Sequence, residues 1–141
     1  MPHLVIEYTN NLRDRFDARV ALAELNRELD AVGEFVSEDI KSRARALDTF
    51  VVGLSGREEA FIHVELAIMA GRSPELKDDV LKRVLAVVRG HVVAPTDMRM
   101  QITVRIVDID RHGYAKAVVG DAGRKPPSQA CADVSASRAA P

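Results

Sequence analysis

The sequence predicts an α+β fold in which two β-α-β units form one sheet with both helices on the same face. Segments with alternating apolar residues are interleaved with segments whose apolar residues recur every three or four positions. The resulting order is strand, helix, strand, and then strand, helix, strand again. Residues 4–7 (LVIE), which begin the first half, are echoed by residues 62–65 (IHVE), which begin the second. The chain is therefore interpreted as a duplicated unit with pseudo-twofold symmetry.

The first half begins with a strand at residues 4–8 and continues into an amphipathic helix. Leu4, Ile6 and Tyr8 fall on one face of that strand. The helix follows a polar turn, and its apolar residues recur at steps of four and three: Ala18, Leu22, Leu25, Leu29 and Val32. Gly33 suits the C-terminal cap of this helix. Alternation returns over residues 40–50, which are predicted to form the second strand.

The second half repeats this pattern, with strands predicted at residues 60–68 and 100–109. The helix between them is predicted to begin at Pro74, with Ser73 as its N-cap, and to be ended by Pro95. Its buried stripe is expected to contain the following residues: Val80, Leu81, Val84, Leu85, Val87 and Val88.

One domain is expected over residues 1–119, followed by a disordered tail at residues 120–141. The tail is rich in Ala, Ser, Pro and Gly and has no periodicity. With 141 residues, of which 47% are hydrophobic, the chain has material for one packed core. A chain this short leaves much of its surface uncovered, so self-association is expected.

Charge and cysteine content narrow the partners and the compartment. The net charge of −1 gives no general attraction to nucleic acid or to an anionic membrane, so neither is expected as a partner. The only cysteine, Cys131, cannot form an internal disulfide, which fits a reducing compartment. Glu7 interrupts what would be the apolar core of a signal peptide, and no run approaches the ~18 apolar residues of a membrane span. A cytoplasmic location is expected.

Pro2 is the first candidate for chemistry. The initiator methionine is normally removed before a small residue, and this would leave Pro2 with a free secondary amine. An α-amino group titrates at about 7.7 to 8.0, and apolar surroundings or nearby cations lower that pKa. The neutral amine would then be a general base at neutral pH, held in place by the strand that follows it. The alternative is that proline in the second position has no role.

Cations provide the second group of candidates. Lys41, Arg43 and Arg45 alternate along a predicted strand, so they share one sheet face at intervals of about 7 Å. Either protein carboxylates such as Glu7 and Glu65 or an anionic ligand would balance their charge. This face is polar in all four predicted strands, and we expect other subunits to cover it.

Arg72 lies in the turn before a helix N-terminus, where backbone N–H groups also favour anions, although an exposed loop arginine is the alternative interpretation. The histidines show no metal-ligand spacing, so no metal and no cofactor are expected.

Several short motifs occur in the order found in a known family. They are Pro2-His3, Glu7, Asn11, Arg13, Ile40-x-Ser42-Arg43, Asp48-Thr49, Ala60-Phe61-x-His63 and Ala70-Gly71-Arg72-Ser73. This set resembles the 5-carboxymethyl-2-hydroxymuconate isomerase family of the tautomerase superfamily over roughly residues 2–110. The resemblance implies a tautomerase-like fold and a homotrimer, with polar sheet faces around the threefold axis and the active site near a subunit boundary.

The resemblance also implies roles for individual residues. Pro2 would be the catalytic base, and Arg72 matches an arginine that the family uses near the substrate. Lys41 stands where the family usually has arginine, and a lysine offers a point charge in place of a bidentate grip. No site residue is assigned to the segment after Ile109, which departs from the family's usual ending.

The sequence thus predicts a cofactor-free isomerase of aromatic-compound catabolism. It would ketonise a di- or tricarboxylate enol such as 5-carboxymethyl-2-hydroxymuconate. Neutral Pro2 would move the proton, while Lys41 and Arg72, with Arg43, hold the carboxylates. Two alternatives stay open. One is a proline-based hydratase or decarboxylase of an acidic unsaturated substrate. The other is a non-catalytic trimeric binding module, which is favoured if Met1 is retained, because the Pro2 nitrogen would then be an amide.

Overall fold

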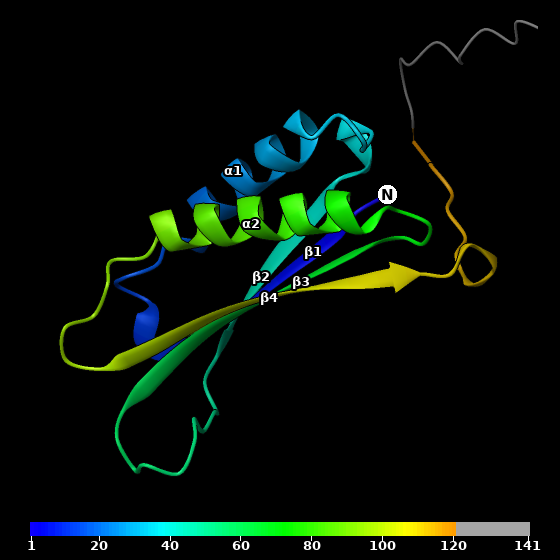
Figure 1. The fold of residues 1–141 in the computed structure, drawn as a ribbon. Coiled ribbons are helices and arrows are strands. Elements are labelled where there is room, and N and C mark those ends of the chain that lie inside the picture. The colour runs from blue at the N-terminus through cyan, green and yellow to red at the C-terminus, as the bar shows by residue number, and fades with distance from the viewer. Residues whose placement is uncertain (121–141) are drawn as a thin grey trace, which may run out of the picture.

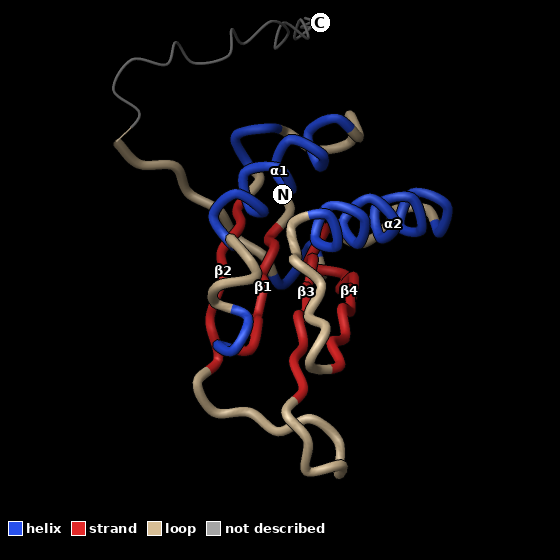
Figure 2. Tube along the Cα trace, turned by 90° about the vertical axis from the view of Figure 1, so that its left-hand side faces the viewer, coloured by secondary structure: helices blue, strands red, loops and turns tan. Residues whose placement is uncertain are grey.

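Four strands form one mixed sheet in the computed structural model, which describes residues 1–120, and two α-helices pack on one face of it (Figure 1). The elements in chain order are β1 (His3–Thr9), α1 (Ala18–Ala31), β2 (Lys41–Leu47), β3 (Glu59–Met69), α2 (Pro74–Gly90) and β4 (Arg99–Ile109). The strand order is β2-β1-β3-β4 (Figure 2). Outer strands run parallel to their inner neighbours, and the inner strands β1 and β3 are antiparallel. This arrangement confirms the predicted α+β fold.

The strand register confirms the predicted duplication. Ile6 pairs with Val64 near the centre of the β1–β3 ladder, and a twofold rotation about that point exchanges β1 with β3 and β2 with β4. Each half contributes one parallel strand pair joined by a helix, as expected for a right-handed crossover unit. Both helices therefore lie on the same side of the sheet (Figure 1).

Both helices begin as predicted, with a side chain at the N-cap. The Asp17 carboxylate accepts the backbone N–H groups of Arg19 and Val20 at the start of α1, and the Ser73 hydroxyl accepts the N–H of Leu76 in α2. Gly33, just beyond α1, has a φ of 76°, the left-handed conformation that glycine adopts without strain.

The prediction that Pro95 ends the second helix is wrong. The helix ends at Gly90, and the backbone N–H of His91 closes its last turn. The chain then leaves the helix to pair with the segment before α1: Val92 forms a β-bridge with Phe16, and the N–H of Val93 donates to the carbonyl of Arg15. These long-range hydrogen bonds replace the helical ones before the proline is reached.

The core lies between the helices and the sheet. Its fully shielded side chains from the strands and helices include Leu4, Ile6, Leu25, Leu29, Ile62, Val64, Leu66, Val80, Val84 and Val88. Burying a side chain of this size contributes about 1.5 to 3 kcal/mol. The predicted buried stripe of α2 was too wide, because Leu85 is 41% exposed and Leu81 only partly buried. Positions 80, 84 and 88 face the sheet, while position 85 turns away from it.

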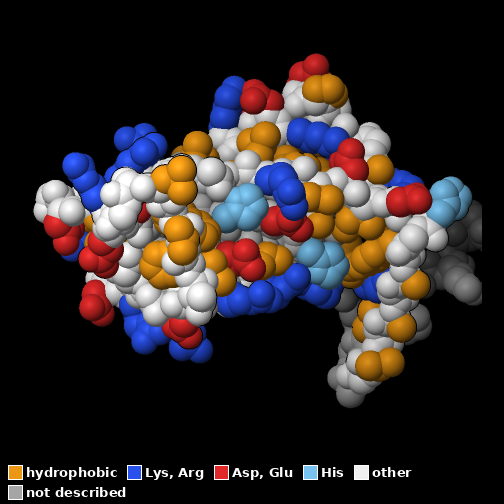
Figure 3. All heavy atoms as spheres, turned by 90° about the horizontal axis from the view of Figure 1, so that it is seen from below, with side chains coloured by type: hydrophobic (Ala, Val, Ile, Leu, Met, Phe, Trp, Pro, Cys, Tyr) orange, Lys and Arg blue, Asp and Glu red, His pale blue; other side chains and the backbone are white. Residues whose placement is uncertain are grey.

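No element within residues 1–120 covers the opposite face of the sheet, as the alternation along the strands predicted. Basic, acidic and histidine side chains lie together over its middle, with hydrophobic side chains around them (Figure 3). Arg45 pairs with Glu7 at 3.4 Å, and Arg105 pairs with Glu65. Because each arginine stands opposite its glutamate in the ladder, the two ion pairs occupy equivalent places in the two halves.

The segment between β2 and β3 is longer than predicted, because β2 ends at Leu47 and not near residue 50. The turn glycines Gly53 and Gly56 lie in this segment with positive φ angles. The predicted disordered tail lies outside the described residues apart from Gly120, and Cys131 lies there as well. Neither α1 nor α2, nor any shorter helix of residues 1–120, has the length and hydropathy needed to cross a membrane.

Candidate active site

The start of β1 is held against β2 before the strand proper begins. Pro2 is buried, and its carbonyl accepts the backbone N–H of Lys41 at 3.1 Å. The strand ladder between β1 and β2 thus extends back to Pro2. In this structure Met1 precedes Pro2, so the Pro2 nitrogen is an amide.

The topology brings several distant segments to this same end of the sheet. Because β3 and β4 run antiparallel to β1, their C-terminal ends lie where β1 begins, and β2 begins at that end as well. Figure 1 shows the N-terminus beside the start of α2 and close to the segment that follows β4. The site is therefore assembled from the chain start, the start of β2, the β3–α2 turn and the segment after β4.

A cavity of about 590 Å³ opens beside the chain terminus. Met1, Glu38, Asp39 and Lys41 line one part of it, and residues 114–119 line the rest. The walls are mixed in polarity, with ammonium and carboxylate groups beside alanine and valine side chains. Such a cavity can hold a small organic acid in contact with charged groups.

The electrostatic environment at the chain terminus disfavours a protonated amine. Burial lowers the pKa of the Met1 amine below its ordinary value, and the positive charges of Arg72, Lys116 and Lys41 lower that pKa further. The carboxylate of Asp39 acts in the opposite direction on the same pKa. An amine placed here is neutral at lower pH than an exposed one, which is the condition that a general base requires.

Arg72 lies near this terminus but is already engaged. Its Nη1 donates to Glu34 Oε2 at 2.6 Å, and its Nη2 donates to the Glu34 carbonyl oxygen at 3.0 Å. The guanidinium also lies over the Phe35 ring, 5.6 Å from the ring centroid. The Arg72 side chain is 27% exposed, and its shielded Nε has no hydrogen-bond partner among residues 1–120. Arg72 is thus a fixed cation, unlike a solvated loop arginine.

The other two predicted substrate-binding cations lie in different places. Lys41 lines the cavity, and its Nζ donates to the Asp39 carbonyl oxygen at 3.4 Å. Arg43 lies on the uncovered sheet face opposite Val5, and no ion pair joins it to another residue of the described chain. The structure therefore gathers Pro2, Lys41 and Arg72 at one end of the sheet and leaves Arg43 on the face.

Sequence reasoning missed three residues of this site, which are Asp39, Tyr114 and Lys116. Lys116 forms an ion pair with Asp39. The Tyr114 hydroxyl lies 3.3 Å from His3 Nε2 and donates to Met1 Sδ, and the two aromatic rings meet edge to face at 6.1 Å. The segment that carries Tyr114 and Lys116 has no periodicity that would place it. The one usable signal was topological, since a strand antiparallel to β1 must end where β1 begins.

His3 belongs to the same group of residues. Burial lowers the pKa of His3, and the nearby charges of Lys41, Arg43 and the terminal amine lower it further. Within residues 1–120, no group of three or more His, Cys, Asp or Glu side chains is placed to hold a metal ion.

Comparison with known proteins supports the sequence resemblance. A family model described as 5-carboxymethyl-2-hydroxymuconate isomerase matches residues 2–118. The 5-carboxymethyl-2-hydroxymuconate Delta-isomerase of Escherichia coli is 30% identical over 100 residues, which cover 71% of this chain and 79% of that protein.

Solved structures agree with these sequence matches. A 5-carboxymethyl-2-hydroxymuconate isomerase from Deinococcus radiodurans R1 superposes with a TM-score of 0.69 at 30% identity, over 82% of this chain and 88% of the other. A second structure, described as a 5-carboxymethyl-2-hydroxymuconate delta-isomerase, has a TM-score of 0.68 at 21% identity, over 85% of this chain and 89% of the other, and shows the shared fold.

Proposed function

The chain belongs to the 5-carboxymethyl-2-hydroxymuconate isomerase family of the tautomerase superfamily and is an isomerase; from this premise we propose that it ketonises a 2-hydroxy dienoate with two or three carboxylates, using Pro2 as the general base. The enzyme relatives named above carry 5-carboxymethyl-2-hydroxymuconate in their names, and we propose a substrate of that class here. Its natural setting would be the breakdown of aromatic compounds.

The observation that carries the proposal is the environment of the terminal amine at the start of β1. Burial and three cations lower the pKa of the Met1 amine against the opposing charge of Asp39, and a cavity opens beside it. Removal of Met1 would transfer the free amine to Pro2, one residue along the chain. The hydrogen bond from the Lys41 N–H to the Pro2 carbonyl would hold the new terminus in place.

The chemistry needs one proton to change position and no other reactant. The neutral Pro2 nitrogen takes the proton of the enol hydroxyl, and the oxygen lone pair becomes the carbonyl π bond as the diene electrons shift toward the distal carbon. The protonated amine then returns a proton to that carbon, so the substrate and the enzyme both end with their original proton count. Lys41 and Arg72 would stabilise the negative charge that develops on the substrate as the first proton leaves.

We further propose that the molecule works as a homotrimer. The uncovered sheet face carries apolar side chains such as Val5 among paired charges, a mixture suited to contact with other subunits. Arg43, which lies on that face, would then stand close to a neighbouring subunit. Its predicted contact with substrate depends on this assembly.

The test of the base is the Pro2→Ala variant, with removal of Met1 verified by intact mass in both proteins. A positioned base contributes about 10² to 10⁴-fold to proton transfer, and alanine keeps a primary amine, so activity on an enol substrate should fall by less than that full factor and not vanish. A Pro2→Ala protein with unchanged turnover would show that the base is elsewhere. Turnover of a haloacrylate in place of the enol would favour the hydratase alternative.

A further inference from the structure

We propose that the segment following β4, residues 114–119, forms the specificity wall of this active site, in which the Lys116 ammonium binds a second carboxylate of the substrate. This inference rests on the proposed function, which it deepens by assigning the recognition of a dicarboxylate. We refer to residues 114–119 as the C-terminal wall.

The C-terminal wall is fastened to the start of the chain. Tyr114 contacts His3 through its hydroxyl at 3.3 Å and through its ring edge, and it contacts the side chain of Met1 as well. Loss of Met1 on processing opens space beside this hydroxyl, next to the Pro2 amine. The wall therefore borders the position at which the reacting enol would lie.

Lys116 faces the cavity with its charge accessible. It lines the cavity together with Lys41, and it is held by Asp39. The Lys116 side chain is 38% exposed and the Asp39 side chain 22% exposed, so the lysine is the more exposed partner of this ion pair. An incoming carboxylate can then bind to an ammonium whose position is already fixed.

Because Arg72 is already bound to Glu34, a different cation is needed to bind the second carboxylate. Both Nη atoms of Arg72 already donate to Glu34 and its Nε is shielded, so fewer of its five N–H donors are left for a carboxylate. Within the described chain, the cations that line the cavity are Lys41 and Lys116. Two separate ammonium groups match a substrate with two separate carboxylates.

The kinetic test uses the processed protein with two enol substrates, the dicarboxylate 2-hydroxymuconate and the monocarboxylate phenylenolpyruvate. A hydrogen bond to a charged group contributes about 1.5 to 3 kcal/mol, so Lys116→Gln should raise KM for the dicarboxylate roughly 10- to 100-fold, with a smaller change in kcat. The KM for the monocarboxylate should change by less than about threefold. Lys116→Arg, which keeps the charge, should restore most of the dicarboxylate affinity.

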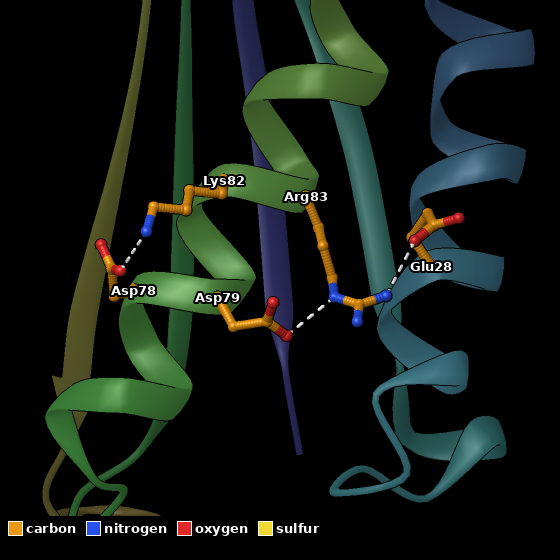
Figure 4. Close-up of polar contacts among 5 residues, drawn as sticks. All are labelled: Glu28, Asp78, Asp79, Lys82 and Arg83. Carbon is orange, nitrogen blue, oxygen red and sulfur yellow. Dashed lines mark hydrogen bonds and ion pairs between the residues drawn. The ribbon is translucent and has the colours of Figure 1, made fainter.

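Lys82→Gln is the matched control. Lys82 also forms an ion pair with an aspartate, at 2.5 Å from Asp78, but it does so on the exposed side of α2 (Figure 4). Its substitution should leave both KM values unchanged. Thermal unfolding of all variants at one protein concentration verifies that the fold is intact.

A pH profile tests whether Lys116 and Asp39 stand close enough to the terminal amine to border the same site, while the KM values test the recognition of the carboxylate. Asp39 raises the pKa of the terminal amine and Lys116 lowers it. The ascending limb of kcat/KM should therefore move to lower pH in Asp39→Asn and to higher pH in Lys116→Gln. If the substitutions only loosened the C-terminal wall, the ascending limb would shift in the same direction in both variants or would not shift in either.

The outcomes are distinguishable from failure of the proposed function. If the parent protein ketonises the dicarboxylate and Lys116→Gln does so with the same KM, the role of Lys116 is refuted and the isomerase proposal stands. Equal increases in KM for both substrates would also refute it, because Lys116 would then act through its general field. If the parent protein turns over neither enol, the proposed function fails and this inference fails with it.

Discussion

At the start of β1, cations near the chain terminus stand beside acidic partners. Arg72 donates to Glu34, and Lys116 pairs with Asp39. The Asp39 carboxylate raises the pKa of the terminal amine, which Arg72 and Lys116 lower, and each carboxylate limits where its partner cation can move. The basicity of Pro2 after processing would accordingly depend on acidic residues as much as on basic ones.

His3 makes the stability of the protein depend on pH. Burial and adjacent cations lower the pKa of His3 from its ordinary value of 6.5, so at mildly acidic pH the unfolded chain binds more protons there than the folded chain. This contribution is fully present above the unfolded pKa and is lost as pH falls below it. The free energy of unfolding should thus rise with pH from the folded pKa of His3 up to about 6.5.

The prediction is checked by urea denaturation across that pH range at a constant protein concentration. The free energy of unfolding should rise less with pH in His3→Gln than in the parent protein. His112, which is exposed, provides the control, and His112→Gln should reproduce the parent profile. An unchanged slope in His3→Gln would show that another group titrates in this range.

Among the elements, helix α2 begins with a side-chain N-cap at Ser73 and carries ion pairs along its exposed side. Lys82 pairs with Asp78 one turn earlier, and Arg83 links Asp79, at 2.7 Å, to Glu28 of α1, at 3.5 Å (Figure 4). Hydrogen bonds to Asp79 and, more weakly, to Glu28 raise the pKa of Arg83. Exposed pairs of this kind stabilise a fold little, so the apolar stripe and the N-cap carry most of the stability of α2.

Ser73→Ala tests the importance of that N-cap. The Ser73 hydroxyl accepts the Leu76 N–H at 3.2 Å, and loss of such a cap should lower the free energy of unfolding by about 1 kcal/mol. Lys82→Gln, which removes only an exposed pair, should cost less than Ser73→Ala in the same denaturation series. The reverse order would mean that surface charges, and not the cap, stabilise this helix.

For the molecule as a whole, the uncovered sheet face is the surface on which we expect other subunits to pack. We expect the 15.5 kDa chain to sediment at three times its mass in analytical ultracentrifugation. Val5→Glu places a carboxylate in the middle of this face, opposite Arg43 and Glu65. The charge is tolerated in a monomer, where water reaches it, but it would be costly in a covered interface.

Val5→Glu should therefore shift the protein to the monomer mass. Val20→Glu is the matched control, because Val20 is 50% exposed on α1, away from the uncovered face. Its mass should stay that of the parent. A parent protein that sediments as a monomer would refute the trimer, and a Val5→Glu protein that stays trimeric would place the interface on another surface.

The sequence by itself was sufficient for the type and order of the helices and strands, the duplication, the polar sheet face and the family. These features depend on local periodicity, on cap residues such as Ser73, and on short motifs around Pro2 and Arg72. Each is a relation between residues close together in the chain or repeated along it. The errors, at Leu85, at Pro95 and at the end of β2, arose where contacts with distant residues decided which face of a helix is buried or where an element ends.

The tertiary structure alone decided which charges meet at the site. Arg72 engages Glu34 from the other half of the duplicated fold, and Lys116 and Tyr114 reach Asp39 and His3 from the segment after β4. No periodicity encodes such pairings, because they follow from strand order and direction. Those depend on how all the apolar faces pack together, and only the folded chain determines that arrangement.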